Sequence, residues 1–113
     1  MDVRRLDVFA KIMMHSPLSE KASSQLKLLP QLDLRAAKPL KDQLMPLLGK
    51  SGHLFIEAGE VTKVSTACVQ VLVAFVIAAR NVAQPLSFST KSPAFSQSFA
   101  LLGLSEFIEE FHP

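Results

Sequence analysis

The sequence contains no Trp and no Tyr, so its 8 Phe residues are all that could build an aromatic platform. Bases, sugars and quaternary ammonium groups are often held on such platforms, and a site of that class would have to rely on phenylalanine. The single cysteine, Cys68, excludes an internal disulfide and fits a reducing compartment. The formal net charge of +2 is too small to indicate nucleic acid or an anionic membrane as partner.

Long apolar runs are also missing. No stretch reaches the roughly 18 uninterrupted apolar residues that a membrane span needs. The longest candidate, residues 69–79, includes Gln70 and is followed by Arg80, so a buried helix is the better interpretation. The N-terminal residues lack the compact apolar region and small-residue cleavage site of a secretory signal. We therefore expect a cytoplasmic protein without direct membrane insertion.

Residues with typical catalytic or metal-binding spacing are scarce. The histidines, His15, His53 and His112, lie far apart, and no CxxC, HxxH or HExxH spacing occurs, so we predict no metal site. Gly49-Lys50-Ser51 is similar to the end of a phosphate-binding loop, but the predicted helix precedes it instead of following it. No acid–base or nucleophile–base cluster stands out, so we expect no cofactor and no enzymatic activity.

What is present is a short, apolar chain. Its 113 residues, of which 49% are hydrophobic, predict one domain with one core. Residues 1–24 are interpreted as an N-terminal extension, helical or mobile, because Ser16-Pro17 interrupts a short amphipathic pattern. Residues 25–113 are assigned to the folded domain.

Pro and Gly residues divide this domain into alternating elements. We predict strands within 25–34, 53–58 and 86–90, helices over 36–48, 65–82 and 93–102, and a final strand or short helix over 104–111. Such alternation favours an α/β layer with parallel crossovers, in which three or four strands are covered by helices.

Two hydroxyl residues, Ser65 and Thr66, open the most apolar of these helices. A helix N-terminus presents unpaired N–H groups and the positive end of the helix dipole, which favour a phosphoryl group or a partner's anion. The commoner role of such residues is a plain N-cap, which stabilises a helix by about 1 kcal/mol. Cys68 lies just inside this helix, and without a neighbouring His or charge it fits a buried apolar residue better than a reactive thiol.

Several stretches of the chain resemble the STAS family, named for sulphate transporters and anti-sigma-factor antagonists. The landmarks are LDLRAA at 32–37, LFIEA at 54–58, the decisive stretch VTKVSTACVQVL at 61–72, and the late segment 92–104. The resemblance covers most of the chain, from Lys27 to Phe107. It implies a single-domain α/β fold with a mixed sheet of about four strands and helices packed on it.

The decisive stretch departs from the family pattern at two positions. In that pattern an Asp precedes the phosphoacceptor Ser or Thr of the anti-sigma-factor antagonists, and the acceptor position is Thr66 here. Ser65 stands in place of the Asp, and Cys68 in place of a Gly. The resemblance implies that Ser65 and Thr66 are phosphoacceptor or contact candidates. The further interface candidates that it implies are Lys63, Val64, Cys68 and Val69.

By this resemblance the protein is a non-enzymatic regulatory or adaptor module that binds a signalling protein, such as an anti-sigma factor or a chemotaxis-type kinase. Thr66 is then either a phosphorylated switch or a constitutive contact residue. The alternative is an accessory STAS subunit of a bacterial lipid-transport ABC system, because the Thr66-Ala67 pair is similar to those subunits, whose Thr contacts the ATPase subunit. The expected partner is a protein and not nucleic acid, and a homodimer is compatible with the sequence.

Overall fold

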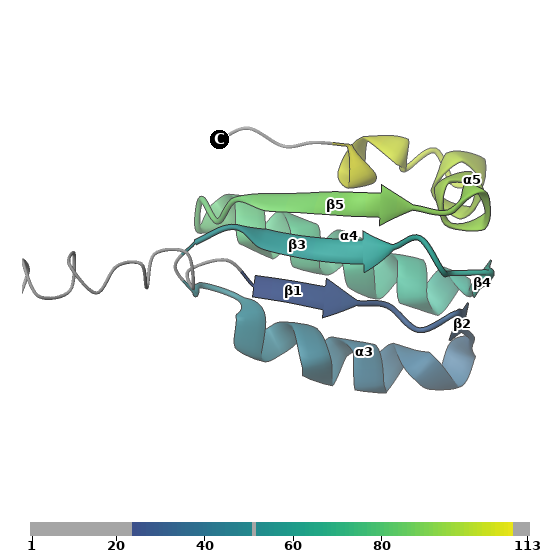
Figure 1. Cartoon of the computed structure of the whole chain (residues 1–113), viewed down its shortest axis with the longest axis horizontal. Coiled ribbons are helices and arrows are strands. Elements are labelled where there is room, and N and C mark those ends of the chain that lie inside the picture. The colour runs from purple at the N-terminus through teal and green to yellow at the C-terminus, as the bar shows by residue number, and fades with distance from the viewer. Residues whose placement is uncertain (1–23, 51, 110–113) are drawn as a thin grey trace, which may run out of the picture.

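The computed structural model describes residues 24–50 and 52–109 (Figure 1). The expected N-terminal extension lies outside these residues, apart from Ser24, which begins the first strand. The strands are β1 (Ser24–Lys27), β2 (Gln31–Leu32), β3 (Leu54–Ala58), β4 (Lys63–Val64) and β5 (Leu86–Lys91). The α-helices are α3 (Ala37–Leu44), α4 (Thr66–Asn81) and α5 (Pro93–Leu101), and short 3-10 helices occupy Leu34–Ala36, Met45–Leu47 and Ser105–Ile108.

The strands pair in parallel, as the alternation of strands and helices predicts. In the described part of the chain β1, β3 and β5 form a three-stranded sheet in the order β1-β3-β5, and β2 pairs separately with β4. The α/β class is therefore confirmed, but the expected mixed sheet of about four strands is not what the described residues form. Pro30 marks the division, because it has no N–H to continue the first ladder, and its carbonyl accepts hydrogen bonds from the amides of Thr62 at 2.7 Å and Lys63 at 3.3 Å. The chain after β1 thus leaves the main sheet and starts a second ladder.

The core lies between the three-stranded sheet and the helices. Alternate residues of β3, namely Leu54, Ile56 and Ala58, are fully buried, as expected for a strand with one face against a core. Helix α4 passes behind β3 and β5 (Figure 1) and contributes Leu72 and Val76 to the same core. No helix among the described residues is long and apolar enough to span a membrane.

The end of helix α3 coincides with a proline and a glycine of the sequence. Helix α3 ends at Leu44, and the chain continues as a 3-10 turn with Pro46 at its start, because proline is tolerated there but not inside a helix. Gly49 then adopts a φ of 81°, which glycine accepts without strain. The buried Gln84 fixes this end: it accepts a hydrogen bond from the Gly49 amide at 2.7 Å and donates one to the Leu47 carbonyl at 2.9 Å.

The C-terminal end of the described chain is a 3-10 helix, Ser105–Ile108, which lies within the segment expected to be a strand or a short helix. Ile108 is buried against the core, and the Lys91 ammonium donates a hydrogen bond to its carbonyl at 3.1 Å. This contact ties the end of the domain to the last strand.

Candidate functional site

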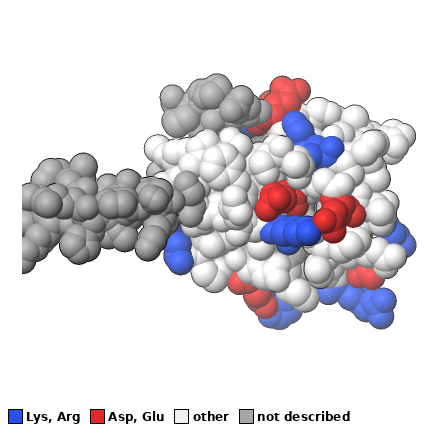
Figure 2. All heavy atoms as spheres, viewed as in Figure 1, with Lys and Arg blue, Asp and Glu red and all other residues white. Residues whose placement is uncertain are grey.

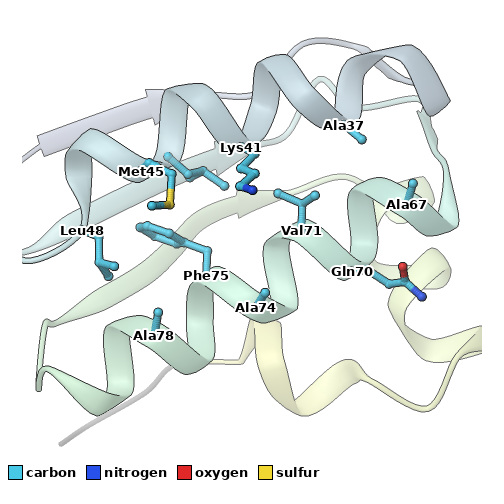
Figure 3. A pocket seen from close by; sticks show the side chains of 11 residues that line it. Ala37, Lys41, Met45, Leu48, Ala67, Gln70, Val71, Ala74, Phe75 and Ala78 are labelled. Atoms are coloured by element: carbon cyan, nitrogen blue, oxygen red, sulfur yellow. The ribbon is translucent and has the colours of Figure 1, made fainter.

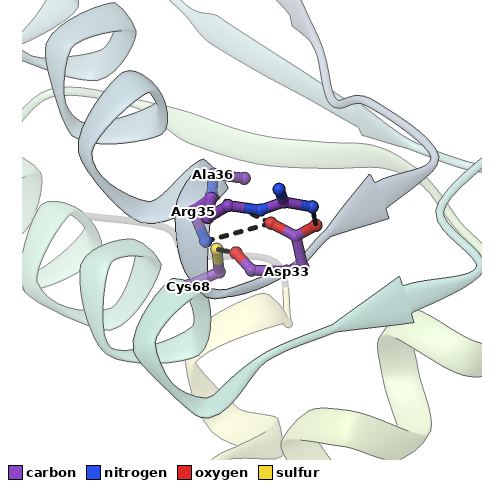
Figure 4. Close-up of polar contacts among 4 residues, drawn as sticks. All are labelled: Asp33, Arg35, Ala36 and Cys68. Atoms are coloured by element: carbon purple, nitrogen blue, oxygen red, sulfur yellow. Dashed lines mark hydrogen bonds and ion pairs between the residues drawn. The ribbon is translucent and has the colours of Figure 1, made fainter.

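The pairing of β2 with β4 brings together two loops that are 32 residues apart in sequence, as the register Gln31↔Lys63 and Leu32↔Val64 shows. The Ser65 amide extends this ladder by donating to the Leu32 carbonyl at 2.7 Å. One turn further on, the Cys68 Sγ donates to the Asp33 carbonyl at 3.3 Å (Figure 4). The LDLRAA stretch and the start of α4, two landmarks of the sequence, are therefore direct neighbours.

Asp33 organises the first of these loops. One carboxylate oxygen accepts hydrogen bonds from the backbone amides of Arg35 at 3.0 Å and Ala36 at 3.2 Å, and the other forms an ion pair with the Arg35 guanidinium at 3.5 Å (Figure 4). Asp33 therefore caps the short 3-10 helix that leads into α3. In the sequence Asp33 is only one residue of the LDLRAA landmark. In the structure it has a definite role as a helix cap.

Ser65 is the N-cap of α4, which confirms the interpretation of this position as a cap. Its backbone is extended, and its Oγ accepts a hydrogen bond from the Cys68 amide at 3.2 Å. Its carbonyl accepts the first intrahelical bond, from Val69, at 3.0 Å. An Asp at this position can accept the same bond, so the replacement of the family's Asp by Ser keeps the helix capped. The Ser65 hydroxyl is thus engaged in the fold.

Thr66 differs from its neighbour in that its side chain is exposed at the first helical position. Within the described residues, no hydrogen bond uses its hydroxyl. The amides of the first helical turn lack intrahelical acceptors, and the N-terminus of this 16-residue helix carries the positive end of its dipole. Lys63, also exposed, adds a positive charge just before the helix. This arrangement is suited to hold a phosphoryl group or a carboxylate.

Exposed leucines lie beside this hydroxyl. A hollow of about 170 Å³ is lined by Val64, Thr66, Val69 and Ser98 together with Leu101 and Leu102 at the end of α5. The two leucines are 77% and 45% exposed. We call the surface formed by Lys63, Val64, Thr66, Leu101 and Leu102 the Thr66 face. It combines one free hydroxyl, one cation and an apolar patch, the mixture that is typical of protein-binding surfaces.

Two of the predicted interface residues, Cys68 and Val69, are buried. Cys68 is 0% exposed, so its side chain cannot reach a partner, whereas Val69, at 1% exposed, still lines the hollow beside Thr66. The reason is that α4 is apolar nearly all round, and these positions belong to the side that faces the core. Cys68 is instead a buried free thiol, as its interpretation as a small core residue predicts. Lys63 and Val64 remain interface candidates because Lys63 is exposed and Val64 only partly buried.

Charged side chains outside this region are scattered over the surface, and basic and acidic ones are interspersed on the face drawn in Figure 2. No group of three His, Cys, Asp or Glu side chains among the described residues could hold a metal ion. The Lys27 ammonium lies 2.7 Å from the Glu60 carboxylate, and this hydrogen bond raises the pKa of Lys27 above its usual value of 10.5. Both side chains are well exposed, so the pair is a surface contact between β1 and the loop after β3.

Comparison with known protein families finds one match that covers most of the chain. A family model described as "Mlab, STAS domain" matches residues 17–109. The match therefore includes both loops and all five residues of the Thr66 face. A search of curated proteins found no match to the chain.

Proposed function

The chain belongs to the STAS family, a family of regulatory and binding modules, and we propose that it is a non-enzymatic adaptor that binds a signalling protein through the Thr66 face. The observation that carries this proposal is the free Thr66 hydroxyl beside two exposed leucines. Full burial of one leucine side chain stabilises an interface by about 1.5–3 kcal/mol. Leu101, at 77% exposed, would supply an anchor of this kind.

We propose a cytoplasmic kinase or an anti-sigma factor as the partner, with phosphorylation of Thr66 as the switch. A phosphoryl group adds about −1.5 to −2 charges at this position. Lys63 and the first amides of α4, apart from the Cys68 amide that Ser65 caps, would stabilise that charge. An apolar partner surface bound to Leu101 and Leu102 would be repelled by it. Phosphorylation would thus release the partner without unfolding the domain.

The second candidate is an accessory STAS subunit that contacts the ATPase subunit of a lipid-transport ABC system. Two observations favour it. The matching family model carries the description "Mlab, STAS domain". In addition, Ser65 replaces the Asp of the phosphorylated family members, while the Thr66-Ala67 pair is similar to that of the transport subunits. In this case Thr66 stays unmodified and is a permanent contact residue.

A capture experiment tests the proposal and separates the two partners. The full chain is used as bait in its native cell, and proteins captured by the wild type are compared with those captured by the Thr66→Glu and Leu101→Glu variants. Asn81→Glu, at the exposed far end of the same helix, is the matched control. We expect one main protein to be lost with both face variants and kept with the control. A kinase or an anti-sigma factor supports the first candidate and an ATPase subunit the second, whereas capture that is unchanged in both variants refutes the Thr66 face.

Phosphorylation needs a separate test with the captured kinase and ATP. Intact-mass analysis should show one added phosphoryl group on the wild type and none on Thr66→Ala. Ser65→Ala is the control and should still be modified, because the hydroxyl it removes caps the helix. An added group that persists in Thr66→Ala, or a wild type that stays unmodified, would remove Thr66 as acceptor.

A further inference from the structure

A second surface, distinct from the Thr66 face, lies between α3 and α4. Here the two helices leave a groove of about 470 Å³ that is lined by 11 residues (Figure 3). Lys41 from α3 and Met45 from the 3-10 turn after it face Val71 and Phe75 from α4 across this groove (Figure 3). None of the five residues of the Thr66 face belongs to the lining.

The α4 wall of the groove has helical spacing and small side chains. Ala67, Val71, Ala74 and Ala78 recur every three or four residues, so they form one stripe along the helix. At 1.5 Å per residue this stripe is about 16 Å long, or three helical turns. Because three of the four side chains are alanine, the wall is low and leaves room for the side chains of a third helix. An apolar ridge at positions i, i+4 and i+7 of such a helix would fit this space.

The charge of the groove has one sign. Of the 11 lining residues, Lys41 is the only charged one, and none carries a carboxylate. No ion pair involves Lys41 within the described residues, since its neighbours Lys38 and Asp42 pair with each other at 3.0 Å. Helix α4 contains no Asp or Glu between Thr66 and Asn81. The groove thus presents one unpaired cation between two apolar walls, which favours an anionic flank on whatever binds there.

The groove is also held open by the fold. Gln84 ties the Met45–Leu47 turn to the end of α4 through its hydrogen bonds to Gly49 and Leu47. This clamp positions the end of the α3 wall, where Met45 and Leu48 line the groove. A preformed wall lowers the ordering cost of binding.

We propose that the α3–α4 groove binds an amphipathic helix of another protein, with an apolar ridge flanked by Asp or Glu. This second surface goes beyond the function proposed for the Thr66 face. With both surfaces occupied, the protein would join two binding partners, or two segments of one partner.

The test uses a displayed library of helical peptides with fixed apolar residues at i, i+4, i+7 and i+11 and randomised charged positions, selected against the full chain. We expect acidic flanks to be enriched, and a synthetic peptide of the enriched sequence to shift amide NMR signals along α3 and α4. Ala74→Glu and Lys41→Glu should each weaken that peptide at least about tenfold. Both positions are exposed, so thermal denaturation should show little change in stability.

Two comparisons make the test decisive. Lys41→Glu should gain affinity for a peptide in which the acidic flanks are replaced by Lys, whereas Lys63→Glu, on the Thr66 face, should bind the original peptide like the wild type. Enrichment of basic or uncharged flanks, or binding that neither groove variant weakens, overturns the proposal. Self-association of the full chain that Ala74→Glu abolishes also overturns it, because a second copy would then fill the groove. None of these results affects the dependence of partner capture on Thr66 and Leu101.

Discussion

The hydroxyls of Ser65 and Thr66 should contribute differently to stability, although they are adjacent. The Ser65 Oγ accepts a hydrogen bond from the Cys68 amide at 3.2 Å, so Ser65→Ala leaves this partly buried N–H without its partner. Loss of an N-cap of this type lowers the free energy of unfolding by about 1 kcal/mol, within a range of about 0.5–2 kcal/mol. In a domain of this size 1 kcal/mol corresponds to a decrease of about 4–8 °C in the thermal midpoint.

Thr66→Ala removes no hydrogen bond within the described residues and places a better helix former at the first helical position. We therefore expect its thermal midpoint to stay the same or to rise by a few degrees. Thermal and urea denaturation of the purified full chain, followed by circular dichroism, measures both variants. Ser65→Asp is the control and should recover the stability lost in Ser65→Ala, because a carboxylate also caps a helix and favours its N-terminus. Equal destabilisation by Thr66→Ala and Ser65→Ala would refute the division of roles between the two hydroxyls.

Three further changes test the packing around the two surfaces, each by urea denaturation. Cys68→Gly, which restores the residue type of the family pattern, should lower the free energy of unfolding by about 2 kcal/mol, because glycine loses more conformational entropy on folding and a buried side chain is removed. An unchanged value would contradict the buried position of Cys68. Gln84→Leu should lower the free energy of unfolding by about 1–3 kcal/mol, because it leaves the Gly49 amide and the Leu47 carbonyl unpaired. A neutral result would mean that water replaces both hydrogen bonds. Ala83→Gly should raise the free energy of unfolding by up to about 1 kcal/mol, since Ala83 has a φ of 54° that glycine adopts more easily. A decrease in this free energy would show that the gain in unfolded-chain entropy dominates.

The order of elements could be predicted because local signals mark it. Ser65 and Ser92 cap the helices that follow them, and Gly49 and Gly103 take positive φ values after helical segments. The separation of β2 and β4 from the main sheet could not be predicted in the same way. It depends on the Pro30 carbonyl, whose hydrogen-bond partners lie about 30 residues away in the chain.

The site was predictable only in part, for a similar reason. The hydroxyl pattern points to Thr66, but the apolar residues of α4 surround the helix and do not tell which side is buried. The burial of Val69 therefore needed the packed structure, whereas the burial of Cys68 agrees with its interpretation as a small core residue. Leu101 and Leu102 follow the buried Phe95 and Phe99 in α5, and only the tertiary arrangement shows that they are exposed next to Thr66.

The central claim is that a protein partner docks on the Thr66 face, and quantitative capture from the native cell tests it most directly. Full-length wild type, Thr66→Glu, Leu101→Glu and Asn81→Glu are compared at equal expression, with the amount of each captured protein measured by mass spectrometry. The account predicts one main partner that is depleted by both face variants and retained by Asn81→Glu. Equal capture by all four proteins, with their folds intact, would contradict it.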